Sequence, residues 1–151
     1  MQQAKEASGV FERLGYPVQQ VRCLVTLAWL LLRKERFDLA GEMAFHAIDV
    51  LPEKDERIPV YECHRVLGQI YKSKGKTEKA VYHSEIVLGV ASTLNDAGFS
   101  FPVHFDLVVT FAQQGRFGDA QTRVEHARSF AVNDTYLLTR ASLPQAELWY
   151  M

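Results

Sequence analysis

The feature that most constrains this chain is a repeat of forty residues that needs no gap. When residues 21–60, 61–100 and 101–140 are written as three rows, side chains of one kind fall in the same columns. The clearest columns are Leu27, Leu67 and Leu107; Leu31, Tyr71 and Phe111; and Ala40, Ala80 and Ala120. Self-similarity at a period of about 20 to 50 residues indicates a repeat architecture, in which each unit buries its apolar face against its neighbours.

The apolar side chains within each row have the spacing of a helical hairpin. An early stripe follows the i, i+3, i+4, i+7 pattern of an amphipathic helix, and a second stripe comes after it. In the first row these stripes are Leu24, Leu27, Ala28 and Leu31, and then Ala40, Ala44, Ala47, Ile48 and Leu51. Gly75 and Gly115 lie between the stripes of their rows, where a left-handed residue is expected after a helix end, and Glu35 holds that place in the first row. Each row is therefore predicted to be a helix A followed by a helix B, and the fold to be all-α.

The expected helices fill the chain as a single solenoid fragment. The predicted hairpins are residues 17–52, 59–95 and 101–132, with Pro52, Pro59 and Pro102 between hairpins, where prolines stop or start helices. Residues 2–15 have the pattern of a helix B without its helix A, and residues 134–151 that of a helix A without its helix B. We therefore expect the chain to belong to a longer solenoid and to self-associate through these two orphan terminal helices.

One row resembles a known repeat family. The segment Leu67-Gly68-x-x-Tyr71-x-x-x-Gly75-x-x-x-x-Ala80 resembles the signature of the tetratricopeptide repeat (TPR), and the forty-residue period resembles its longer-helix variety. The other rows match less fully, and the tryptophan usual early in helix A is replaced by Leu24, His64 and His104. The resemblance extends over residues 1–151 and implies a right-handed α-solenoid of TPR-like helical hairpins.

A second resemblance concerns the end of the chain. Residues 101–131 and 136–149 look like the TPR tails of fungal STAND or NLR-like signalling proteins, which carry a P-loop NTPase domain. This chain has no P-loop: Gly75-Lys76-Thr77 resembles the end of a Walker motif, but Gly68 stands too far before it, and a helix rather than a strand is expected there. The resemblance implies an alternative function, an oligomerisation or sensor segment of a larger signalling ATPase with no ligand of its own.

Composition and charge argue against several classes of protein. Seventeen basic against eighteen acidic residues give a net charge of -1, which argues against a nucleic-acid module. The longest near-continuous apolar run, Cys23–Leu32, is interrupted by Thr26 and is far shorter than the roughly 20 residues that span a bilayer. The polar N-terminus does not have the pattern expected of a signal peptide. Two cysteines cannot form a disulfide framework. We expect a cytoplasmic protein with no membrane or nucleic-acid partner.

The helices A are expected to present one face to a concave groove. Residues two positions beyond the core leucines are rotated from them by about 200°, and they form a ladder that Trp29 begins. TPR grooves hold extended or helical peptides on this face, so the resemblance implies a protein or peptide ligand held by aromatic anchors. The alternative is that Trp29 only packs between neighbouring helices. The predicted groove residues are Arg22, Val25, Trp29, Leu32, Arg33, Glu62, Arg65, Gln69, Lys72, Phe105, Val109 and Trp149.

No residue pattern predicts catalysis, a cofactor or a metal site. The carboxylate clamp of chaperone-tail binders is absent, since its places hold Val25, Trp29, Val66, Pro102 and Asp106. His64 and His104 are repeat-equivalent and expected about 10 Å apart, but no Cys or Asp completes a zinc set. Cys23 and Cys63 are equivalent too, and are expected to be free thiols because they lie too far apart for a disulfide. The chain is therefore predicted not to be an enzyme.

Overall fold

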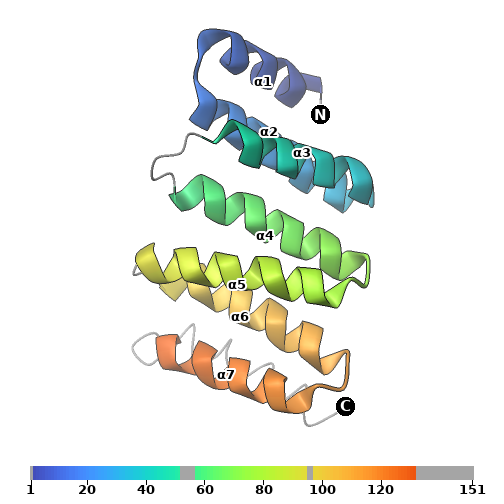
Figure 1. Cartoon of the computed structure of the whole chain (residues 1–151), viewed down its shortest axis with the longest axis vertical. Coiled ribbons are helices and arrows are strands. Elements are labelled where there is room, and N and C mark those ends of the chain that lie inside the picture. The colour runs from blue at the N-terminus through green and yellow to red at the C-terminus, as the bar shows by residue number, and fades with distance from the viewer. Residues whose placement is uncertain (1, 52–56, 95–96, 132–151) are drawn as a thin grey trace. The chain divides into compact units, whose positions relative to one another are not determined.

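All regular secondary structure in the described part of the chain is helical (Figure 1). The computed structural model describes residues 2–51, 57–94 and 97–131. Its seven helices are α1 (Gln2–Leu14), α2 (Pro17–Arg33), α3 (Phe37–Val50), α4 (Arg57–Ser73), α5 (Thr77–Leu94), α6 (Ala97–Ala112) and α7 (Phe117–Ala131). The all-α prediction is confirmed over these residues, whereas the predicted helix at 134–151 lies outside them.

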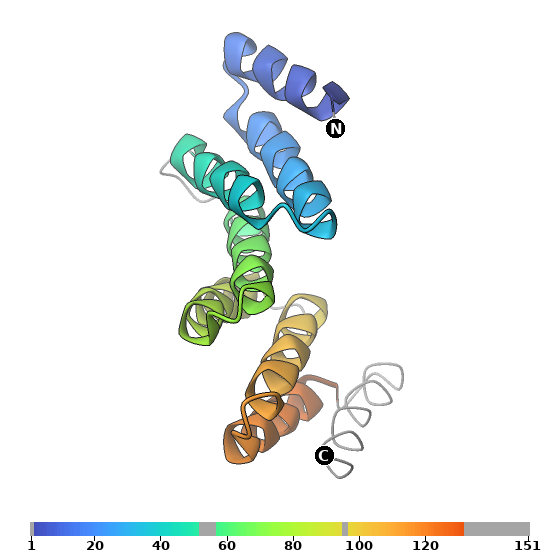
Figure 2. The same ribbon diagram turned by 90° about the vertical axis from the view of Figure 1, so that its right-hand side faces the viewer.

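The chain divides into two compact units, Met1–Val90 and Ala91–Met151. In the first unit α1 packs on α2, α2 packs on α3, and α4 packs on both α2 and α3. In the second unit α6 and α7 pack side by side as an antiparallel hairpin (Figure 2). Each unit is thus built from helices that pack on their neighbours in the chain, which is a repeat-like arrangement.

The same turn follows α2, α4 and α6. Glu35, Gly75 and Gly115 are left-handed, with φ of 57°, 65° and 71°. The next residue in each turn donates a backbone hydrogen bond of 2.9 Å to a carbonyl five residues earlier: Arg36 to Leu31, Lys76 to Tyr71 and Arg116 to Phe111. This is the Schellman pattern, in which a left-handed residue lets the last carbonyls of a helix find donors. The left-handed conformation predicted for Gly75 and Gly115 is confirmed.

The repeat columns form the core. Leu27, Leu67 and Leu107 are almost completely buried, and so are the helix-B alanines Ala40, Ala80 and Ala120. In the first unit one apolar cluster joins α2, α3 and α4: Ala28, Leu31, Ala40, Ala44, Val66, Leu67 and Ile70. Small side chains on α3 let it approach α2 closely, so the leucine stripe of α2 is covered without a gap.

Two prolines depart from the expected pattern. Pro59 is the third residue of α4, and Pro102 lies inside α6, so these helices begin before the hairpin boundaries that the prolines suggested. A proline in the first turn removes no helical hydrogen bond, because the N–H groups there have no partner within the helix. Pro102 lies beyond that turn and removes the N–H that would bond to the carbonyl of Gly98.

No helix in residues 2–51, 57–94 or 97–131 is both long and apolar enough to cross a bilayer.

Candidate ligand groove

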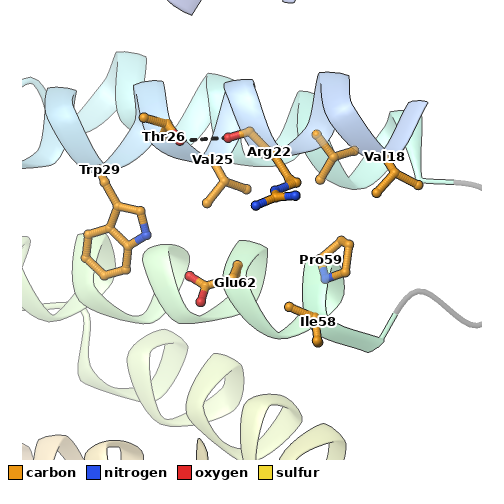
Figure 3. A pocket seen from close by; sticks show the side chains of 9 residues that line it. Val18, Arg22, Val25, Thr26, Trp29, Ile58, Pro59 and Glu62 are labelled. Atoms are coloured by element: carbon orange, nitrogen blue, oxygen red, sulfur yellow. Dashed lines mark hydrogen bonds between the residues drawn. The ribbon is translucent and has the colours of Figure 1, made fainter. Parts of the chain in front are cut away.

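An open groove lies between α2 and α4 in the first unit (Figure 3). It has a volume of about 510 Å³. Four predicted groove residues, Arg22, Val25, Trp29 and Glu62, line it. The other lining residues are Val18, Val21, Thr26, Ile58 and Pro59. We call this space the α2–α4 groove.

One end of the groove is apolar. On α2, Val18, Val21 and Val25 follow helical spacing, so they share the face that looks toward α4. Val21 is fully buried and forms the floor with Val25, whereas Val18 is half-buried at the rim. Ile58 and Pro59 close this end from the first turn of α4, and Ile58 keeps 53% of its surface exposed. An apolar side chain entering here would therefore remove both its own surface and that of Ile58 from water.

Two opposite charges face the middle of the groove from its two walls. Figure 3 shows Arg22 reaching from α2 toward α4, and Glu62 projecting from α4 into the same space. Arg22 is exposed and Glu62 half-buried, and neither forms an ion pair within the described residues. The hydroxyl of Thr26 donates a hydrogen bond of 2.8 Å to the Arg22 carbonyl, so it is held by its own helix. Arg22 and Glu62 thus offer a donor and an acceptor across the groove.

The other end of the groove is aromatic, because Trp29 lines it, and Arg65 of α4 lies beside that ring. Trp29 is half-buried and packs against the cluster that joins α2, α3 and α4, and against a second apolar cluster that includes Val21, Leu24 and Cys63. The Arg65 guanidinium carbon lies 5.7 Å from the centre of the Trp29 ring and 6.0 Å from that of Tyr61. These distances are within the range of cation–π attraction, and Tyr61 is held rigidly because only 2% of its surface is exposed. The Nε atom of Arg65 is buried and has no hydrogen-bond partner.

The remaining predicted residues lie outside the α2–α4 groove. Leu32 packs on the core and Arg33 is exposed in the last turn of α2, whereas Gln69 and Lys72 are half-buried on α4. Phe105 and Val109 are half-buried on α6, in the second unit, and Trp149 lies outside the described residues.

The apolar end of the groove, which includes Val18 and Ile58, was not predicted from the sequence. Val18 precedes Arg22 by one helical turn, and Ile58 precedes Glu62 by one turn. Extending each predicted face one turn toward the start of its helix would have found both residues. The signal was hidden because Pro59 was expected to mark the helix start, although α4 begins at Arg57.

A second depression, on the other side of α4, contrasts with this groove. It has a volume of about 390 Å³ and lies between α3 and α4, lined by residues that include Phe37, Phe45 and Tyr71. Its one basic side chain is already paired, because Lys74 donates to the Asp38 carboxylate. That hydrogen bond and the positive charge of Lys74 lower the pKa of Asp38. Glu42 is the other charged side chain in the lining, so this depression offers a ligand no unpaired cation of the kind that Arg22 presents in the α2–α4 groove.

Histidine rings on the two helices of a hairpin contact each other, which the repeat columns did not predict. The Nδ1 atoms of His64 and His83 lie 2.9 Å apart, and the His83 ring stacks on Tyr71. Burial, followed by the charges of His64 and Lys79, lowers the pKa of His83 to about 4. In the second unit, the ring of His104 meets the edge of His126. His64 is thus paired within its own hairpin, whereas the repeat columns suggested only its equivalent, His104, as a neighbouring histidine.

Neither the histidines nor the cysteines form a metal centre in the described residues. No group of three or more potential metal ligands occurs there. Cys23 and Cys63 are free thiols, as expected, and burial raises the pKa of Cys63 to about 12. A thiol with so high a pKa is a poor nucleophile at neutral pH, because the thiolate is the reactive form.

The walls of the α2–α4 groove combine an apolar end, two facing charges and an aromatic ring, with the Arg65 cation beside that ring. No family model matches the sequence, and a search of the curated proteins finds no match.

Proposed function

We propose that this chain is a TPR-like protein- or peptide-binding module, and that the α2–α4 groove holds an extended segment of the partner. On this proposal the repeat-like helical fold is part of a right-handed α-solenoid, and the protein is a cytoplasmic scaffold without enzymatic activity. Phe105 and Val109 hold the repeat-equivalent positions on α6 and are proposed to contribute to ligand binding there.

The observation that carries the proposal is the composition of the groove walls. Hot spots of binding favour aromatic and arginine side chains that meet apolar surface, and Trp29, Arg22 and Val18 supply these together. The stretch of α2 from Val18 to Trp29 is about 16 Å long at 1.5 Å per residue. An extended chain of about five residues spans that length. Arg22 and Glu62 are suited to hydrogen-bond the carbonyl and N–H groups of such a chain.

The test is selection from a library of random nine-residue peptides with the whole chain as bait. We expect peptides to be enriched by the wild-type protein and by Phe45→Asp, but not by Val18→Asp. Both variants place a carboxylate at an exposed or half-buried apolar position, and only Val18 lines the groove.

The folding of both variants is checked by thermal unfolding followed by circular dichroism. Failure of the wild-type chain to enrich any peptide over an empty support would overturn the proposal. Equal binding by both variants, with both folded, would place the binding surface outside the groove.

A second candidate function is the oligomerisation segment of a larger signalling assembly. It is favoured by the apolar side chains that α1 and the turn after it leave exposed: Val10, Leu14 and Tyr16. Exposed apolar patches of this kind are often covered by a partner, here a second copy of the chain. The measurement of solution mass proposed in the Discussion separates this function from peptide binding.

A further inference from the structure

A cation that lacks an anion lies beside the aromatic end of the α2–α4 groove. Arg65 is half-buried next to Trp29, which lines the groove, and next to Tyr61, and its Nε atom is buried without a hydrogen-bond partner. Within the described residues no carboxylate pairs with it, and this includes Glu62, one helical turn earlier on α4. An unpaired charge that has lost part of its water carries a free-energy cost, which an anionic ligand group would remove.

We propose that the partner segment carries an aspartate or glutamate side chain, which binds Arg65, and an apolar side chain, which enters the end formed by Val18, Val21, Ile58 and Pro59. This inference rests on the proposed function and specifies its ligand. The aromatic rings beside Arg65 hold the guanidinium in place, so little rotamer freedom is lost when the carboxylate binds.

The distance along α4 gives the spacing of the two anchors. Ile58 and Arg65 are separated by about 10 Å at 1.5 Å per residue. An extended peptide covers this distance in about three residues. The acidic and the apolar residue are therefore three positions apart in the partner.

Arg22 and Glu62 set the charge preference between the anchors. They face the groove from opposite walls, and together they carry no net charge. The backbone of a peptide, which is neutral and offers both donors and acceptors, matches this pair better than a further charged side chain does. The groove thus selects one acidic position rather than a run of acidic residues.

The test begins with the peptides selected from the nine-residue library. The strongest binder that contains the predicted acidic residue is synthesised in two forms, with Glu at that position and with Gln. Binding is followed by the fluorescence of Trp29 in a Trp149→Phe background, which leaves a single tryptophan. Because hydrogen bonds to charged groups are the stronger ones, we expect the Glu form to bind about 10- to 100-fold more tightly.

Three variants locate the anchor. Arg65→Met keeps the aliphatic contact with the two rings but removes the charge, so it should reduce the affinity for the Glu peptide to that for the Gln peptide. Arg65→Lys keeps the charge and should restore part of the difference. Arg13→Met, at an exposed position of α1, should change neither affinity.

The outcomes separate the two proposals. If the library yields no binder, the proposed function fails. If it yields binders with no acidic position three residues from an apolar one, peptide binding stands and this inference is overturned. It is also overturned if folded Arg65→Met still prefers the Glu peptide to the same extent.

Discussion

At the scale of single residues, Glu35 carries a strain that its repeat equivalents avoid. Its φ of 57° lies in the left-handed region, where a side chain clashes with the backbone, and Gly75 and Gly115 occupy the same place in the other turns. In all three turns the residue after the left-handed one donates the same backbone hydrogen bond to a carbonyl five residues earlier. The turn therefore forms in spite of Glu35, because the packing of α2 on α3 determines it.

We expect Glu35→Gly to raise the free energy of unfolding by about 0.5–1 kcal/mol, because glycine adopts this conformation without a clash. Lys34→Gly is the matched control. Lys34 has a φ of -96°, so glycine there adds only chain entropy in the unfolded state and should destabilise the protein by about 0.5 kcal/mol. Urea unfolding measures both, and a destabilised Glu35→Gly would contradict the argument.

The paired histidines make stability depend on pH. An unfolded histidine takes up its proton near pH 6.5, whereas the pKa of His83 is lowered to about 4 in the folded state. Between these values the unfolded chain binds more protons, so the contribution of His83 is present above pH 6.5 and is lost as the pH falls toward 4. The pKa values of His64 and His104 are lowered as well, so these two histidines act in the same direction.

The prediction is that His83→Gln loses less stability than the wild type between pH 7 and pH 4.5. One pKa unit corresponds to about 1.4 kcal/mol, so we expect the difference in loss to reach roughly 1 kcal/mol or more. His46→Gln, at an exposed position of α3, should follow the wild-type curve. Denaturant unfolding across this pH range measures the three proteins, and identical curves for His83→Gln and the wild type would refute the role of the pair.

At the scale of helices, α4 and α5 approach each other closely at Gly68, yet a methyl group still fits. A Cβ atom built on Gly68 would meet Ser84 Oγ at 3.4 Å, the Ala80 carbonyl oxygen at 3.7 Å and His83 Cβ at 3.9 Å. These are ordinary contact distances, so the position tolerates alanine but has no room for a branched side chain.

Gly68→Ala is therefore expected to stabilise the protein by up to about 1 kcal/mol, through the higher helix propensity of alanine. Gly68→Leu should destabilise it by about 1–3 kcal/mol, because it overpacks the contact with α5. At Gly41 in α3 nothing lies within 4 Å of the added Cβ, so neither Gly41→Ala nor Gly41→Leu should destabilise. Thermal unfolding compares the four variants. Equal effects of leucine at the two glycines would contradict the close contact between Gly68 and α5.

The turns and the core were predictable from the sequence, because both depend on local spacing. Gly75 marks a helix end through its own backbone preference, and Leu67 marks a buried face through helical periodicity. The start of the third hairpin was predicted wrongly from Pro102, because a proline is more common at the start of a helix than inside one. In the structure Pro102 lies inside α6.

The groove was only partly predictable, because it depends on how α2 and α4 face each other. Helix periodicity grouped Arg22, Trp29 and Glu62 on one predicted face, and all three line the space between α2 and α4. It did not indicate that Arg65 would lie close to the rings of Trp29 and Tyr61, since a cation–π contact depends on side-chain direction. The partner of His64 was hidden for the same reason: the repeat equivalents of His83 are Met43 and Arg123, so no histidine column points to it.

At the scale of the whole molecule, one copy of the chain leaves apolar side chains of α1 exposed to water. On α1, 41% of Val10 and 59% of Leu14 are exposed, and Tyr16, just after the helix, is 52% exposed. Exposed apolar and aromatic side chains that lie together in this way are often covered by a partner.

We therefore predict that the chain self-associates through α1. Light scattering over a concentration series should show a rising mass for the wild type, and Leu14→Lys should remain monomeric. Lysine suits the last turn of a helix, so this variant should fold normally. Phe45→Asp, at an exposed position of α3, should associate as the wild type does. A constant monomer mass for the wild type at high concentration would refute self-association.

The recurrence of one turn at Glu35, Gly75 and Gly115 has a consequence for how such a chain can be lengthened. Each turn ends one helix and starts the next with the same backbone hydrogen bonds, so a forty-residue block cut at two of these turns has matching ends. A block of residues 36–75 duplicated in tandem would meet its copy through a turn that the chain already uses. Gene duplication at this point adds a helical pair without requiring a new connection, and it provides a simple route by which a helical chain of this kind becomes longer.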